Sequence, residues 1–356
     1  MTRLDDLEGI DALDSLDVLG AMEDFADQLR VGWELGDNVE SLPLEEGIDS
    51  VAILGMGGSG SAGDIARVVA EPRIPVPFRV FKGYGDLPSW IGRNSLVIAS
   101  SYSGNTEETL DALSEAHARG TRMVTISSGG QLETLAVEYG AASVQVPPGR
   151  QPRASLGYLT MPLLAVLSRM GLIPDLSADA AEAVRVVAEI CQSCHRKKPE
   201  PENPAKLLGA RLAGTLPLVY GGQGLGATAA YRFKCDLNEY AKMHAFSNEI
   251  PEANHNEIVG FASPQFADQL AAVYLRDAEE HPRIARRFEV FGRLIAGGVS
   301  DSITIESKGT SVLARILSLV AVTQFAAIYA GLAQGVDPGP VEPIENLKRE
   351  LDQEDR

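Results

Sequence analysis

The chain has 356 residues, of which 45% are hydrophobic and 22% charged, and its formal net charge is −18. This composition fits a globular protein large enough for two domains, and three cysteines in so long a chain argue against a disulfide framework. The negative charge disfavours nucleic acid and anionic membranes as partners, because both attract basic surfaces. Residues 1–17 lack the basic and apolar regions of a signal peptide, so we expect a cytoplasmic protein.

The first half of the chain predicts a helix followed by an α/β domain. Apolar residues recur at helical spacing over residues 11–35, so residues 1–40 are assigned to an N-terminal helix. Beyond it, short apolar runs alternate with helical stretches, which is typical of a parallel sheet covered on both faces. Residues 41–150 therefore form a first domain. Its predicted strands are 51–55, 78–81, 96–100, 123–127 and 143–146, and its predicted helices are 61–69, 107–119 and 131–138.

The second half restarts the same theme after a connecting region. Residues 151–204 contain two predicted helices, 155–170 and 178–195, and a polar linker. Residues 205–335 are assigned to a second α/β domain and residues 336–356 to a C-terminal helix. The second domain's predicted strands are 216–220, 270–275 and 302–307, and its predicted helices are 227–234 and 309–333. Gly57-Gly58-Ser59-Gly60 matches Gly221-Gly222-Gln223-Gly224 in type and in order, which indicates an internal repeat.

A glycine-rich loop follows the first predicted strand. Its letters, GMGGSG from Gly55 to Gly60, match the dinucleotide fingerprint, but that fingerprint needs an acidic residue at the end of the next strand, where Lys82 stands. The plainer alternative is that the glycines only permit a tight turn. Because small residues let a ligand approach bare backbone, we favour phosphate binding at Gly57, Gly58 and Ser59.

A second loop places three hydroxyl side chains, Ser101, Ser103 and Thr106, between a strand and a helix. Free N–H groups and the dipole at a helix N-terminus favour an anion there. Asn105 or Thr106 is alternatively a simple helix cap, which accounts for one hydroxyl and not for three. The two loops are expected to meet at the carboxyl edge of a parallel sheet, where ligands bind in such folds.

GMGGSGSAGD and SYSGNTEET together resemble the signature of sugar-isomerase (SIS) domains, and the whole chain resembles the bifunctional phosphoglucose/phosphomannose isomerase family. The resemblance implies an α/β fold of two tandem SIS domains, each an αβα sandwich. It implies that Ser59, Ser101, Ser103 and Thr106 hold the phosphate of a sugar phosphate. The second repeat has Gln223 in place of Ser59, so it is expected to bind none.

The resemblance also implies an aldose–ketose isomerase of glucose 6-phosphate and fructose 6-phosphate, with no cofactor and no metal, and leaves mannose 6-phosphate open as a further substrate. That reaction needs a base for the C1/C2 proton, groups that open the ring and a charge that stabilises the enediolate. NEYAK, PEANHNE, PRA and the terminal helix resemble family stretches. They imply Glu239 as the base, His255 from the neighbouring subunit of a homodimer and Lys348 in ring opening, and Arg153 beside the enediolate.

Each of these residues has a plainer interpretation. Glu239, Arg153 and Lys348 are each alternatively a charge that meets solvent, and His255 a hydrogen-bonded loop residue. The threonine that family members often carry before the terminal lysine is absent from Gly339–Pro343, which bears on whether the mannose epimer fits. The rival functions are a non-catalytic sensor of sugar phosphates, another SIS enzyme and a dehydrogenase.

Overall fold

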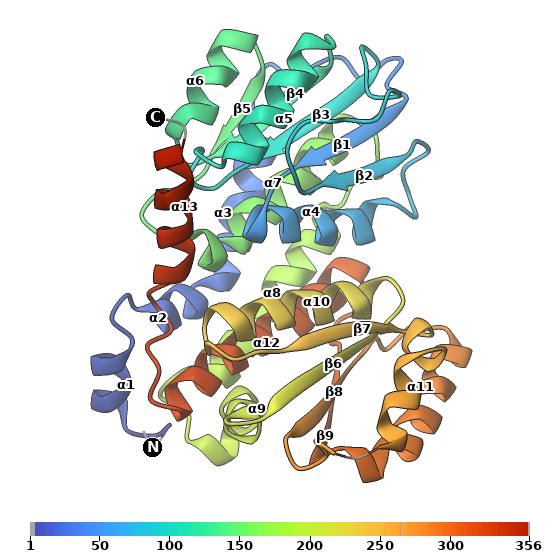
Figure 1. The fold of residues 1–356 in the computed structure, drawn as a ribbon. Coiled ribbons are helices and arrows are strands. Elements are labelled where there is room, and N and C mark those ends of the chain that lie inside the picture. Colours follow the sequence, from blue (N-terminus) through green and yellow to red (C-terminus); the bar gives the residue numbers. More distant parts are fainter. Residues whose placement is uncertain (1–3, 264, 355–356) are drawn as a thin grey trace.

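The computed structural model describes residues 4–263 and 265–354. It contains two parallel sheets, which lie one above the other in Figure 1. The first sheet has the strand order β2-β1-β3-β4-β5 and the second the order β7-β6-β8-β9. The strands are β1 Ser50–Leu54, β2 Phe78–Phe81, β3 Ser95–Ser100, β4 Arg122–Ser127, β5 Ala142–Gln145, β6 Leu216–Gly222, β7 Phe246–Ile250, β8 Leu270–Arg276 and β9 Asp301–Glu306.

Helices cover both faces of the first sheet. Residues that alternate along each strand point to opposite faces: Ile53 and Ile98 pack with α3, α4 and α7, whereas Leu54 and Val97 pack with α5 and α6. The fold is therefore the expected αβα sandwich. The helices of this half are α1 Leu7–Leu13, α2 Val18–Glu23, α3 Phe25–Asp37, α4 Gly57–Ala70, α5 Glu107–Ala118, α6 Gly130–Tyr139, α7 Leu156–Arg169 and α8 Ser177–Cys194.

The second sheet repeats the arrangement. Helices α10 and α12 contribute to the core on one of its faces, and α11 packs on the other. Helix α12 is long and apolar enough to cross a membrane, the one such helix among the described residues, but 94% of its most apolar stretch is buried as a core helix. The helices of this half are α9 Pro204–Leu212, α10 Leu225–Glu239, α11 Pro282–Ile295, α12 Val312–Ala333 and α13 Glu342–Glu354.

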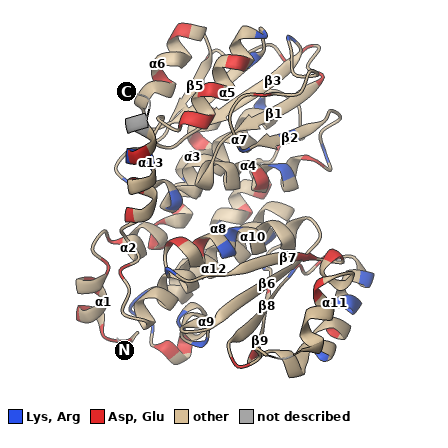
Figure 2. Cartoon of the chain, viewed as in Figure 1, with Lys and Arg blue, Asp and Glu red and all other residues tan. Residues whose placement is uncertain are grey.

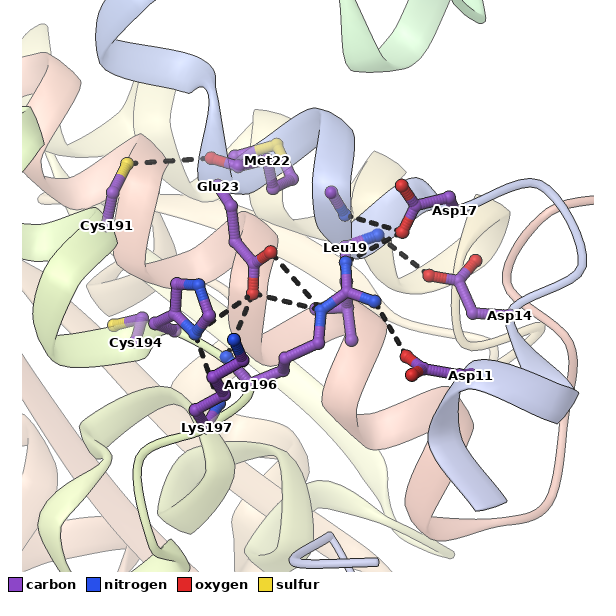
Figure 3. Close-up of polar contacts among 12 residues, drawn as sticks. Asp11, Asp14, Asp17, Leu19, Met22, Glu23, Cys191, Cys194, Arg196 and Lys197 are labelled. Carbon is purple, nitrogen blue, oxygen red and sulfur yellow. Dashed lines mark hydrogen bonds and ion pairs between the residues drawn. The ribbon is translucent and has the colours of Figure 1, made fainter. Parts of the chain in front are cut away.

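The single N-terminal helix predicted from the sequence is wrong, because three short helices occupy that segment. The Asp14 carboxylate accepts hydrogen bonds from the first two N–H groups of α2 at 2.8 Å, and Asp17 adopts a left-handed conformation that ends a continuous helix. Arg196, just after α8, forms ion pairs with Asp11, Asp17 and Glu23 at 2.7–3.1 Å and so links α1 and α2 to the end of α8 (Figure 3). Acidic residues of the N-terminal segment thus hold its helices in place.

Three elements of the second half were not predicted: α9, β7 and α11. Helix α9 begins at Pro204, inside the predicted linker, and β7 is a polar edge strand. The order strand, glycine turn, helix does repeat. However, Gly57 opens α4, whereas its letter match Gly221 lies within β6 and α10 opens only at Leu225. The two glycine loops therefore do not correspond residue by residue.

Acidic residues line the outer helices α5 and α6, whereas arginines gather on α11 (Figure 2). Helix α11 carries four arginines, Arg283, Arg286, Arg287 and Arg293. The negative charge of the chain is thus unevenly spread, and any anion site elsewhere depends on local donors.

Candidate active site

The glycine loop and the serine–threonine loop meet at the carboxyl edge of the first sheet. Strands β1 and β3 are parallel neighbours, and Leu54 at the end of β1 pairs with Ala99 near the end of β3. The helices that follow, α4 and α5, therefore begin side by side at that edge. Two helix N-termini with their free N–H groups supply positive potential without any basic side chain.

The serine–threonine loop is organised by its own hydroxyls. Ser101 Oγ lies 2.8 Å from Thr106 Oγ1 and accepts from the Gly104 N–H at 3.1 Å. Ser103 Oγ accepts from the Asn105 N–H at 3.3 Å. Thr106 stands at the N-cap position of α5, yet its side chain makes no capping hydrogen bond to the helix. The alternative that Thr106 simply caps the helix is therefore wrong. The Thr109 N–H donates to the Thr106 carbonyl oxygen, whereas the Glu107 and Glu108 N–H groups have no partner among the described residues and remain as donors for a ligand.

Gly104 gives this loop its tight shape. Its φ of +69° lies in the left-handed region, and a Cβ atom there would stand 1.8 Å from the Gly129 carbonyl oxygen. A close backbone approach of this kind requires glycine. The glycine therefore fixes where Ser101, Ser103 and Thr106 stand relative to one another.

The glycine loop lies against the segment that carries Arg153. Gly57 is exposed with a φ of +50°, and Ser59 is buried in the first turn of α4. A Cβ atom on Gly58 would lie 2.9 Å from the Pro152 carbonyl oxygen, so only glycine lets the segment 152–154 pass this close. Lys82, where a dinucleotide site needs an acid, pairs with Asp64. This pairing gives Lys82 a structural role.

Arg153 is buried against the segment that leads into α13. Its Nη2 donates to the carbonyl oxygens of Pro338, at 3.1 Å, and Gly339. Its guanidinium lies 5.3 Å from the centre of the Tyr240 ring. Arg153 Nε is buried and has no partner among the described residues. An unpaired buried guanidinium donor costs about 1–3 kcal/mol, which functional sites tolerate more often than cores do.

Glu239 stands next to these groups, half-buried as the last residue of α10. Lys242 Nζ donates to the Glu239 carbonyl oxygen at 2.5 Å and to the Pro338 carbonyl oxygen at 3.3 Å. Partial burial and the charge of Arg153 lower the pKa of Lys242, against the opposing charges of Asp337 and Glu239. Sequence reasoning missed Lys242, although it lies three residues after Glu239 in the same motif.

His255 and Lys348 are not part of this cluster. His255 is exposed after β7, at the carboxyl edge of the second sheet. Glu239 ends α10, whose first residue lies at that same edge, and 15 helical residues span about 22 Å. The two side chains thus lie at opposite edges of the second sheet. Lys348 is exposed on α13 and makes no hydrogen bond or ion pair with any described residue of the cluster.

The CxxCH stretch, which by letter matches a haem-attachment motif, is structural. Cys191 and Cys194 are buried in α8, and burial raises the pKa of each thiol to about 11 (Figure 3). Both sulfurs are therefore protonated at neutral pH and poor nucleophiles. Within residues 4–263 and 265–354, no three His, Cys, Asp or Glu side chains gather as a metal site requires.

Known proteins resemble this chain in sequence and in fold. The family model for the bacterial phospho-glucose isomerase C-terminal SIS domain matches residues 201–351. A bifunctional phosphoglucose/phosphomannose isomerase of Caldicellulosiruptor bescii is 38% identical over 91% of this chain and 96% of that protein. One of Aquifex aeolicus is 34% identical over 94% and 98%. A glucose-6-phosphate isomerase like protein of Thermus thermophilus has the same fold, with a TM-score of 0.60, 22% identity and coverage of 96% and 99%.

Proposed function

Because the chain belongs to the bifunctional phosphoglucose/phosphomannose isomerase family, we propose that it interconverts glucose 6-phosphate and fructose 6-phosphate. The observation that carries this proposal is the adjacency of two groups of residues. An anion site built from neutral donors lies beside Gly58, and Gly58 abuts the segment that holds Arg153 next to Glu239 and Lys242. A phosphate held at one end would leave the other end of a sugar at the charged cluster.

We assign the following roles within this site. Gly57, Gly58, Ser59, Ser101, Ser103 and Thr106 bind the phosphate. Glu239 moves the proton between C1 and C2, for which a half-buried carboxylate is a suitable base. Arg153, whose charge persists at any working pH, stabilises the enediolate. Lys348 and His255 assist ring opening.

The role of His255 requires a homodimer. Within one chain Glu239 and His255 lie at opposite edges of the second sheet, whereas groups that act on one sugar must lie within hydrogen-bond reach of it, about 3 Å. We propose that His255 of a second copy completes the site, which makes the interface part of the catalytic machinery. The cytoplasm is the compartment we propose.

The experiment adds purified protein to fructose 6-phosphate and, separately, to mannose 6-phosphate, and follows glucose 6-phosphate with a coupled dehydrogenase. Glu239→Gln is expected to lower kcat by about 10²- to 10⁴-fold with little change in KM, as loss of a base should. Glu71→Gln, an exposed carboxylate that ends α4, is the matched control. If neither sugar gives product while phosphosugar binding is intact, the sensor is favoured and the proposal is refuted.

Mannose 6-phosphate is a second proposed substrate, because the curated relatives are named for both activities. The stretch Gly339–Pro343 lacks the family threonine, and the Gly339 carbonyl contacts Arg153, so this stretch borders the site. Product from fructose 6-phosphate alone would therefore mean that this stretch narrows the pocket against the mannose epimer.

A further inference from the structure

Helix α10 contains the most deeply buried charged pair among the described residues. Arg232 and Asp236 are each 2% exposed, and they form a two-pronged contact, with Nη2 to Oδ1 at 2.6 Å and Nε to Oδ2 at 3.0 Å. Replacing such a pair with apolar residues of similar volume is often neutral or stabilising, because the charges lose their hydration. Phe233 and Leu237, on the same helix, show that apolar residues pack well here. Stability of the fold therefore does not explain the pair.

The pair is joined directly to the candidate active site. Arg232 Nη2 also donates to the backbone carbonyl oxygen of Arg153 at 2.9 Å. Arg232, Asp236 and Glu239 stand at positions i, i+4 and i+7 of α10, and Tyr240, the C-cap residue, follows at i+8, so the four share one face of the helix. The same helix thus donates a hydrogen bond to the backbone of Arg153 and ends at Glu239.

The surroundings of the pair are polar and incompletely satisfied. The Tyr240 hydroxyl and Arg153 Nε are both buried without a hydrogen-bond partner among the described residues. Burial raises the pKa of Asp236, and the charge of Glu239 adds to this rise, whereas the two-pronged contact with the Arg232 guanidinium opposes it and favours the ionised carboxylate. The titratable groups beside the pair are Cys235 and Glu239 from α10 and Tyr240 just after it, and Tyr240 in turn lies beside the Arg153 guanidinium.

We propose that Arg232 and Asp236 are positioning residues of the isomerase: the pair fixes the Arg153 backbone against α10 and thereby sets the guanidinium at a defined distance from the Glu239 carboxylate. This inference rests on the proposed function of the site. Neither residue needs to contact the sugar. Their contribution is the placement of the two groups that do.

The test replaces the pair with apolar residues of similar size, Arg232→Met/Asp236→Leu. The double variant is expected to fold with a Tm close to that of the wild type, because no buried charge is left unpaired. Its kcat is expected to fall by about 10- to 100-fold with little change in KM, since small misplacements of reacting groups have effects of that size. Arg30→Met/Glu34→Leu, an i,i+4 pair on α3 outside the site, is the matched control.

A single variant supplies a readout that a purely structural role would not move. Asp236→Asn removes a negative charge near Glu239 and leaves Arg232 without its counter-charge, so the Glu239 carboxylate should ionise more readily. The acidic limb of the kcat/KM profile against pH is therefore expected to shift to lower pH. A double variant with wild-type kcat, together with an unshifted limb in Asp236→Asn, would overturn the proposal.

Ligand binding separates this inference from the proposed function. A sugar-acid phosphate such as 6-phosphogluconate carries a carboxylate at C1, whereas sorbitol 6-phosphate is neutral there. The wild type is expected to prefer the acid, because Arg153 faces C1, and the double variant is expected to lose that preference. If the wild type lacks isomerase activity but this loss occurs, the proposed function fails and the positioning role stands. If the wild type is active and the double variant keeps its preference, the positioning role fails.

Discussion

Mixing two inactive variants tests whether Glu239 and His255 serve one site from different chains. Within a chain they lie at opposite edges of the second sheet, with α10, about 22 Å long, running from one edge to the other. In a symmetric dimer, each site would then take Glu239 from one chain and His255 from the other. Glu239→Gln and His255→Ala are each expected to be nearly inactive alone.

The size of the recovery follows from symmetry. If the two variants are unfolded together and refolded as an equal mixture, half of the dimers are mixed, and each mixed dimer has one site with both residues intact. The mixture is therefore expected to reach about 25% of wild-type activity in the coupled assay. A mixture of Glu239→Gln with Arg153→Ala is the control, because both changes fall on the same side of the site and every site stays defective.

The result that would refute this reasoning is a mixture with no activity although mixed dimers form. Differently tagged chains captured in two steps would establish that the mixed dimers are present. Inactive mixed dimers would mean that both residues act in the same site of one chain or that His255 has no part in the reaction.

Three further predictions concern the scaffold. Gly104→Ala should raise KM for sugar phosphates at least about tenfold and lower stability by about 2 kcal/mol, measured by kinetics and denaturation, because the new Cβ would collide with the Gly129 carbonyl; an unchanged KM would contradict the loop assignment. Arg196→Gln should lower stability by about 2 kcal/mol, since it leaves three carboxylates without their shared partner; an unchanged urea midpoint would show that this network contributes nothing. Hydrogen bonds from Ser311 and Thr310 lower the pKa of Glu182 to about 2, so its contribution to stability is present above about pH 4.5 and is lost as pH falls towards 2. Glu182→Gln should thus lower the free energy of unfolding by about 1 kcal/mol at pH 7, a figure reduced for solvent screening of this part-exposed group, and should not change it near pH 2. A loss of stability that is the same at both pH values would contradict the assignment.

The sequence was sufficient for eight of the nine strands and for placing the glycine loop and the serine–threonine loop at one edge of the first sheet. Strands such as β3 are uninterrupted apolar runs, and their alternation with helices fixes a parallel sheet whose loops meet at one edge. Edge strand β7 was missed because its sequence, FSNEI, has no apolar run. Helix α11 had a readable signal, a proline at its start and Phe288, Phe291 and Ile295 at helical spacing.

The other features that the sequence did not predict depend on side-chain contacts, which cannot be inferred from the spacing of residues along the chain. The break between α1 and α2 depends on Asp14, whose carboxylate caps the next helix, and such a residue reads equally well as a surface acid. The partners of Arg153 lie on Pro338 and Gly339, 185 and 186 residues away in the chain. The predicted helix 227–234 ended before Asp236, so the sequence did not place Arg232 and Asp236 one helical turn apart, as α10 does.

Isomerisation in D₂O reveals whether Glu239 moves a proton through an enediolate. The wild type converts fructose 6-phosphate in D₂O, and the C2 position of the glucose 6-phosphate formed is read by NMR. We predict deuterium at C2 from the wild type and none from Glu239→Gln, because the base exchanges its proton with solvent during the reaction. Product that carries no deuterium at C2, or exchange at the wild-type rate in Glu239→Gln, would contradict the account.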